Sequence, residues 1–139
     1  MLKDTELRLG NILQMEDDPE ERVRVADIYK GVVNVKPLHP NSFEHEYPLD
    51  YLQGVPITEE ELTRMGFKKD NRTLWLVVNG GDYYIELDKV RGEWYPDYCQ
   101  CPEFSSVPEQ RINLSAIQYM HQLQNLYYVL TGEELTFKS

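Results

Sequence analysis

Two cysteines, Cys99 and Cys101, have the widest chemical repertoire in this chain, and three histidines accompany them, His39, His45 and His121. Thiolates and imidazoles together could ligate zinc, but a structural zinc site usually takes four ligands, commonly from two paired sets. One tight pair without a second pair nearby favours ordinary reduced thiols. A catalytic thiol would also need a histidine within hydrogen-bond reach, and no local signature indicates one. The sequence therefore predicts no metal, no cofactor and no catalytic residue, and it favours a protein that is not an enzyme.

Other residue groups that could do chemistry have simpler explanations. Asn79-Gly80-Gly81 is glycine-rich, but it lies between two strand patterns, so a hairpin turn is favoured over a phosphate-binding loop. Ser105-Ser106 lacks the strand-to-helix context of a nucleophilic serine. Carboxylates are frequent in so acidic a chain, and solvated surface charge explains them best. Those near the hairpin are Asp82, Glu86, Asp88, Glu93 and Asp97.

The clearest element of the chain is a C-terminal helix, predicted over residues 116–131. Ser115 and Gln118 have the spacing of a capping box at its start, and Gly132 can end it with a left-handed backbone. On a helical projection the apolar residues fall within an arc of about 120°, which predicts a face packed on the core. They are Ala116, Tyr119, Met120, Leu123, Leu126, Tyr127 and Leu130.

A polar stripe lies on the opposite side of this helix. His121, Gln124, Asn125 and Tyr128 follow the i, i+3, i+4, i+7 spacing of one helix face. A solvated face is the favoured interpretation. Such faces usually carry Lys and Glu, however, so a binding surface is the alternative. These four residues form our first group of candidate binding residues.

A second candidate group is the aromatic set Trp94, Tyr95, Tyr98 and Phe104, in a stretch interrupted by prolines. Packing on the core is the favoured interpretation, because large aromatic residues are mostly buried. A binding surface is the alternative, because aromatic side chains contribute much contact area at low entropic cost.

We expect an α+β fold with two subdomains, or one compact unit. Residues 1–55 alternate apolar and polar positions in several short runs, which predicts an SH3-like β-meander or small barrel. Residues 56–139 are expected to form an α+β subdomain with a short helix over 59–65, ended by Gly66. There the pattern over residues 72–95 predicts an antiparallel three-stranded meander. The amphipathic C-terminal helix would cover that meander.

The chain of 139 residues carries a formal net charge of −10. Binding to phosphate groups needs a local excess of Lys and Arg, so no direct binding to nucleic acid is expected, nor binding to an anionic membrane. No signal-peptide pattern and no membrane-spanning apolar run is present, which favours a cytoplasmic protein.

Two segments of the sequence resemble a family of small uncharacterised proteins from bacterial genomes and prophages. They are Glu6-Leu7-Arg8-Leu9-Gly10-Asn11 and the stretch from His121 to Leu135, which reads HQLQNLYYVLTGEEL. The resemblance implies a phage or mobile-element setting, and it transfers no catalytic residue because the family has no known activity. We therefore expect a non-enzymatic interaction or accessory module with a protein partner or self-association. The alternatives are an acidic nucleic-acid mimic that inhibits a DNA-binding enzyme, and a small hydrolase.

Overall fold

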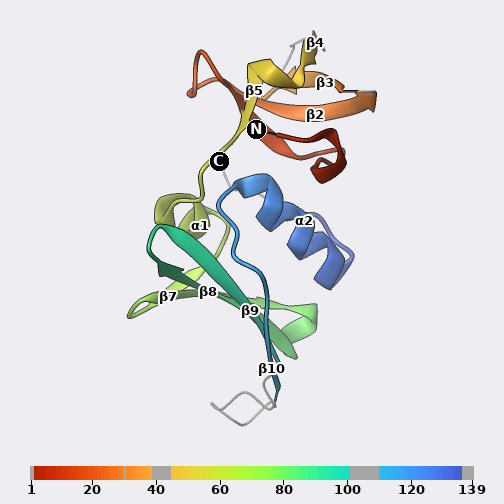
Figure 1. Cartoon of the computed structure of the whole chain (residues 1–139). Coiled ribbons are helices and arrows are strands. Elements are labelled where there is room, and N and C mark those ends of the chain that lie inside the picture. Colours follow the sequence, from red (N-terminus) through yellow and green to blue (C-terminus); the bar gives the residue numbers. More distant parts are fainter. Residues whose placement is uncertain (1, 30, 39–44, 101–109, 136–139) are drawn as a thin grey trace. The chain divides into compact units, whose positions relative to one another are not determined.

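The structure is a computed structural model, and it describes residues 2–29, 31–38, 45–100 and 110–135. These residues form a mixed α+β fold with two antiparallel sheets of five strands each and two α-helices (Figure 1). The chain divides into two compact units. Unit 1 comprises Met1–Pro56 and Tyr119–Leu126, and unit 2 comprises Ile57–Gln118 and Tyr127–Ser139. The α+β class expected from the sequence is confirmed.

The sheet of unit 1 has the strand order β4-β3-β2-β1-β5. Apolar residues alternate along its central strands, and their side chains form the core of the unit with Leu2, Leu7 and Leu52. A 3-10 turn, η2 (Leu49–Tyr51), leads into the last strand. The strands are β1 (Ile12–Met15), β2 (Arg22–Tyr29), β3 (Val32–Pro37), β4 (His45–Pro48) and β5 (Leu52–Gly54).

The small barrel expected for this region is not confirmed, because the described strands form an open sheet and no closed barrel. The edges of the sheet are β4 and β5, which are not paired with each other. The register of β2 on β3 shifts between Val25 and Asp27, as at a β-bulge. Just before β1, Gly10 has φ of +90°, a backbone conformation that glycine adopts without strain.

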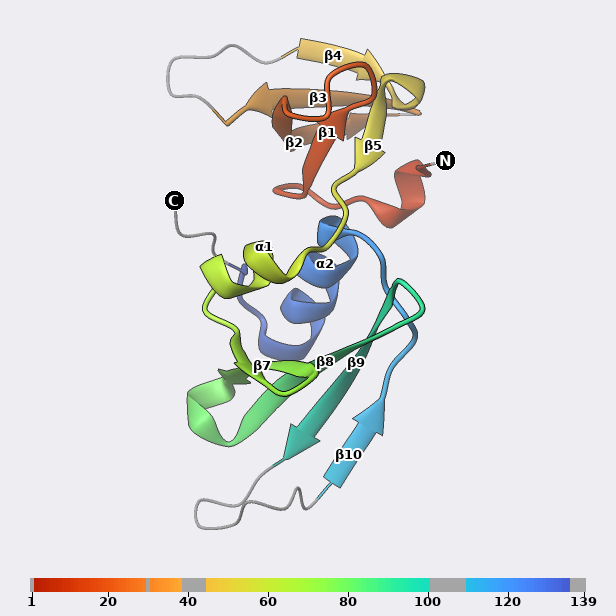
Figure 2. The same ribbon diagram turned by 90° about the vertical axis from the view of Figure 1, so that its left-hand side faces the viewer.

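The sheet of unit 2 has the order β10-β9-β8-β7-β6 (Figure 2). The meander predicted with three strands therefore has five. The predicted turn at Asn79–Gly81 is present as a 3-10 turn, with φ of +73° at Gly80. Short edge strands on both sides escaped prediction because three or four residues give too little periodicity. The strands are β6 (Lys68–Asp70), β7 (Thr73–Val78), β8 (Tyr83–Val90), β9 (Glu93–Gln100) and β10 (Gln110–Asn113).

The short helix α1 (Glu59–Arg64) begins at the predicted residue 59 and ends one residue before the predicted residue 65. Thr58 is its N-cap, and its hydroxyl accepts the backbone N–H of Glu61. Gly66 follows the helix with φ of +100°, a backbone conformation that glycine adopts without strain.

The C-terminal helix α2 (Met120–Thr131) begins four residues later than predicted. The proposed capping residue Ser115 lies outside it, because the next residues are extended. Ile117 exchanges two backbone hydrogen bonds with Trp94, at 2.8 and 3.0 Å, and this pairing replaces the first helical turn. The N-terminal cap is formed instead by Gln122, whose Oε1 accepts the backbone N–H of Tyr119 at 3.0 Å. Gly132 ends the helix with φ of +74°, as predicted.

No helix in the described ranges combines the length and the apolar character that crossing a membrane requires.

Candidate functional site

Gln124, one of the predicted binding residues, is bound to the N-terminal segment of its own unit. Its side chain is 3 % exposed. Its Oε1 accepts the backbone N–H of Ile12 at 2.8 Å, and its Nε2 donates to the carbonyl of Gly10 at 3.2 Å. The side-chain amide thus satisfies two backbone groups at the bend that precedes β1.

Asn125 extends this network. Its Oδ1 accepts from Asn11 Nδ2 at 2.8 Å and from Arg8 Nε at 3.2 Å. Its Nδ2 donates to the carbonyl of Glu6 at 2.9 Å. The donors and acceptors of the side chain are therefore used inside unit 1. For Gln124 and Asn125 the solvated-face interpretation is wrong, since these side chains hold the N-terminal segment in place.

His121 is fully buried in the same unit. Its ring lies parallel to that of Tyr119, with 5.8 Å between the centroids. Neither ring nitrogen has a hydrogen-bond partner in the described part of the chain. Its Nε2 lies 3.6 Å from Oε1 of Glu6, which is too long for a hydrogen bond but close enough for charge attraction. Burial lowers the pKa of His121, and the charge of Glu6 opposes that shift.

Tyr128, the last residue of the predicted stripe, is 42 % exposed and belongs to unit 2. The residues of the stripe therefore differ in exposure, from fully buried His121 to exposed Tyr128. Three of its residues lie in unit 1, of which two are bound to the N-terminal segment and His121 is buried without a hydrogen bond. Periodicity alone assigns a helix face; it does not say which segment far away in sequence covers that face.

The predicted aromatic group lies mainly in strand β9 and not in a loop. Trp94 is 3 % exposed, and its indole N–H donates to the carbonyl of Ile57 at 3.2 Å. Tyr98 stacks on Tyr83 with 4.9 Å between ring centroids. Tyr95 is 42 % exposed. Phe104 lies outside the described residues. The favoured interpretation, packing on the core, therefore holds for Trp94 but not for Tyr95.

Cys99 is a buried free thiol in β9. Burial raises its pKa, and Tyr84 and Arg111, on the neighbouring strands, act to lower it. The pKa of Tyr84 is raised to about 12 by its own burial and by the hydrogen bond to Cys99. Cys101 lies outside the described residues. Across the described ranges, no three His, Cys, Asp or Glu side chains come close enough to hold a metal ion.

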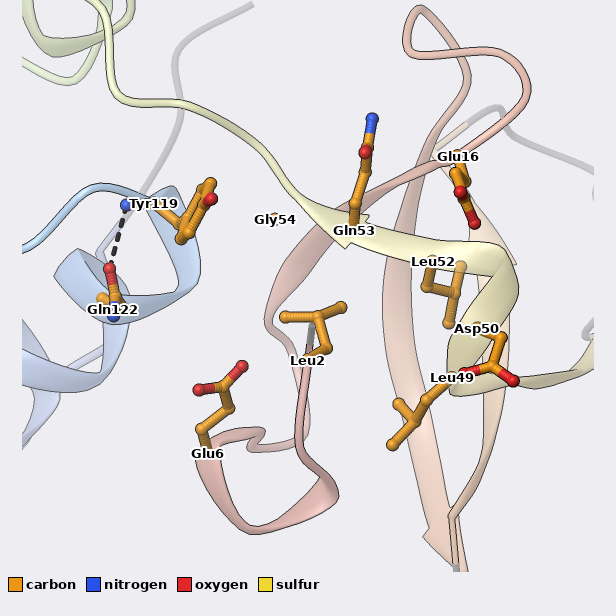
Figure 3. Close-up of a pocket in the computed structure, with 10 residues that line it drawn as sticks. All are labelled: Leu2, Glu6, Glu16, Leu49, Asp50, Leu52, Gln53, Gly54, Tyr119 and Gln122. Atoms are coloured by element: carbon orange, nitrogen blue, oxygen red, sulfur yellow. Dashed lines mark hydrogen bonds between the residues drawn. The ribbon is translucent and has the colours of Figure 1, made fainter.

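The described residues of unit 1 line a pocket of about 360 Å³ (Figure 3). Its lining comes from the N-terminal segment, the end of β1, the segment from η2 to β5, and the start of α2. Three carboxylates line it, those of Glu6, Glu16 and Asp50, together with apolar side chains. The other lining residues are Leu2, Leu49, Leu52, Gln53, Gly54, Tyr119 and Gln122.

The aromatic wall of this pocket is held by a close approach of Tyr119 to β5. A Cβ atom at Gly54 would lie 2.6 to 2.9 Å from three carbon atoms of the Tyr119 side chain. Only glycine leaves space for this contact. The Tyr119 ring also stacks on the ring of His121. The ring is therefore fixed before any ligand arrives.

The charge of the pocket is one-sided. Within the described part of the chain, no Lys or Arg belongs to its lining. Glu6 Oε1 accepts the backbone N–H of Lys3 at 3.2 Å, while Glu16 and Asp50 have no side-chain partner among the described residues. Three carboxylates, with no Lys or Arg beside them in the described lining, attract cations and repel anions. A second hollow, of about 190 Å³, is lined by two carboxylates, Asp27 and Glu46, with Tyr29, Val32 and Asn34.

None of these pocket residues was a candidate from the sequence. They come from four segments, and none of them forms a local motif. Gly54 is the one lining residue whose type is required by the contact it makes, and a single glycine is too common to mark a pocket in the sequence. In comparisons with known proteins, neither a family model, nor a curated protein, nor a solved structure matches this chain.

Proposed function

We propose that this protein is a non-enzymatic interaction module and that the pocket of unit 1 receives part of a protein partner. The observation that carries the proposal is the lining of the pocket. Carboxylates surround an apolar floor, and the aromatic wall is fixed by Gly54. Binding sites for small groups are typically hollows of 300 to about 1,000 Å³ with few polar groups.

The candidate nucleophile, Cys99, lies outside the pocket, and its surroundings give little support to catalysis. A nucleophile needs a base within hydrogen-bond reach. Cys99 is buried beside Tyr84 and Arg111, and no histidine is among the groups that shift its pKa. This arrangement gives less support to the hydrolase alternative. The nucleic-acid mimic also receives less support, because the carboxylates of the pocket surround a hollow, whereas a mimic needs rows of them on an outer surface.

We further propose that unit 1 is an SH3-like module with an incompletely closed sheet. Support comes from the strand order, which places β1 between β2 and β5, and from the 3-10 turn η2 directly before β5. The resemblance of both chain ends to small bacterial and prophage proteins supports a phage or mobile-element setting in the cytoplasm. Self-association is the alternative to a separate protein partner.

Site-specific photo-crosslinking tests the proposed function. A photoreactive phenylalanine analogue is placed at Gln53, which lines the pocket, in the full chain. The matched control carries the same analogue at Val77, an exposed residue of unit 2. Irradiation in lysate of the native host should give one dominant protein adduct from position 53 and not from position 77. Mass spectrometry identifies the adduct.

Equal adducts at both positions, or none at position 53, would contradict the proposal. An adduct made of two copies of the chain would place self-association at this pocket. Such a result would favour the self-association alternative over a separate partner.

A further inference from the structure

We infer that the pocket of unit 1 takes the side chain of a lysine or arginine from a protein partner. This inference rests on the proposed function and adds the chemical class of the occupant. Both side chains carry a cation at the end of a flexible apolar stem. The pocket offers a matching arrangement, with leucines on its floor and carboxylates around it (Figure 3).

The charges of the lining favour an occupant with a positive charge. Glu6, Glu16 and Asp50 bring three negative charges to one hollow, and the lining contains no Lys or Arg among the described residues. A phosphate or carboxylate ligand would be repelled. A neutral ligand would leave the carboxylates without a partner, and it would also have to displace their water.

The buried His121, which lies behind Glu6 and outside the pocket lining, does not neutralise that carboxylate. Its side chain is fully buried, its ring nitrogens lack hydrogen-bond partners, and its Nε2 is directed at Glu6 of the pocket wall at 3.6 Å. Burial keeps its pKa low, so His121 is neutral near pH 7 and leaves the charge of Glu6 uncompensated. A protonated imidazole at this place would neutralise Glu6 and weaken the attraction of a cation. The neutral imidazole of His121 leaves that attraction in place.

The apolar and aromatic lining argues for an organic cation. Leu2 and Leu52 are 8 % and 4 % exposed, and Leu49 packs against the same core cluster. These side chains would cover the methylene groups of a lysine or arginine stem. The fixed ring of Tyr119 lies in the same lining and offers a cation–π contact to the charged end. A bare metal ion gains nothing from leucine or from an aromatic wall.

Titration with short peptides tests this inference. The full chain is labelled with ¹⁵N and titrated with Gly-Ser-X-Ser-Gly peptides in which X is lysine, arginine or norleucine. Norleucine keeps the apolar stem and lacks the cation. The lysine and arginine peptides should shift the amide signals of the lining residues, with at least tenfold tighter binding than norleucine. Added salt should weaken that binding, because solvent-exposed charges are screened.

Two charge-neutralising variants sharpen the test. Glu16→Gln and Asp50→Asn should each weaken lysine-peptide binding about three- to tenfold, since each removes one attractive charge. The control Glu20→Gln changes net charge equally in an exposed residue of the same unit outside the pocket, and it should bind as the wild type does. Equal binding of norleucine and lysine peptides, or unchanged binding by both pocket variants, would overturn the inference.

The outcomes also separate this inference from the proposed function. If a partner is crosslinked at position 53 but the lysine and arginine peptides do not bind, the proposed interaction module would be supported. The inference that a lysine or arginine side chain fills the pocket would then be refuted. An n-butylammonium probe tests whether a free amine, without a protein partner, is the occupant. If it binds as tightly as the lysine peptide and position 53 gives no protein adduct, the pocket is a site for free amines, and a protein partner is excluded as its occupant.

Discussion

The side-chain amide of Gln124 caps the backbone of Ile12, with 2.8 Å between its Oε1 and the Ile12 nitrogen. The two residues are 112 positions apart in the sequence. The same amide donates to Gly10. A residue near the end of the chain thus completes the hydrogen bonds of a bend near its beginning, where β1 starts.

Gln124→Ala is therefore expected to destabilise the protein by about 2 to 3 kcal/mol. The substitution leaves the buried Ile12 N–H and the Gly10 carbonyl without partners, and each orphaned buried group costs about 1 to 3 kcal/mol. Chemical denaturation followed by circular dichroism measures the change. Val129→Ala, at a helix position that is 80 % exposed, is the control and should change stability by less than about 0.5 kcal/mol. A Gln124→Ala protein as stable as the control would show that the network contributes little.

Gly54→Ala is expected to destabilise unit 1 by about 1 to 3 kcal/mol, the usual cost of overpacking. The cause is steric, because the new methyl group would lie 2.6 Å from Cγ of Tyr119. A double variant, Gly54→Ala with Tyr119→Ala, provides the control. If the clash is the cause, alanine at position 54 should cost much less when Tyr119 is already absent. Additive costs in denaturation experiments would refute the steric explanation.

Local signals in the sequence were sufficient for several elements. The stops at Gly66 and Gly132 and the turn at Gly80 depend on one or two residues each, and all are observed. The start of α2 was missed for the opposite reason. Ser115 and Gln118 have capping-box spacing, but the segment between them is held in an extended form because Ile117 pairs with Trp94. A local sequence pattern gives no information about a pairing with a residue 23 positions away.

The candidate site was predicted less well than the fold. The stripe residues Gln124 and Asn125 looked available because a helical projection says nothing about distant segments, and both are bound to residues between Glu6 and Ile12. The pocket was missed because its carboxylates come from separate segments, each of which resembles ordinary surface charge. The close approach of Tyr119 to Gly54 joins two segments of the lining, and it is a contact between residues far apart in sequence, which no local pattern predicts.

The Cys99 thiol is expected to react slowly with alkylating and disulfide reagents at neutral pH. It is buried, and burial raises its pKa, so little of the reactive thiolate forms. Measurement in a Cys101→Ser background with 5,5′-dithiobis(2-nitrobenzoate) isolates this group. The rate should rise by at least tenfold in denaturant. Labelling of the native protein as fast as of the denatured one would show that the thiol is accessible.

His121 should make the protein less stable as the pH falls below about 6.5. Burial lowers its pKa in the folded state, while in the unfolded state the pKa is near 6.5. Between these two values the unfolded chain binds the proton and the folded chain does not, so folding loses up to about 1.4 kcal/mol per pH unit. Above pH 6.5 this contribution to stability is fully present.

The variant His121→Phe isolates this contribution, because it keeps a buried ring and removes the titration. Urea denaturation from pH 8 to pH 5 should give a steeper fall of stability for the wild type than for the variant, with the two curves diverging only below about pH 6.5. Glu6, 3.6 Å from the imidazole, acts in the opposite direction. Glu6→Gln should therefore steepen the wild-type fall. Parallel curves for the wild type and His121→Phe would mean that His121 has the same pKa folded and unfolded, contrary to its burial.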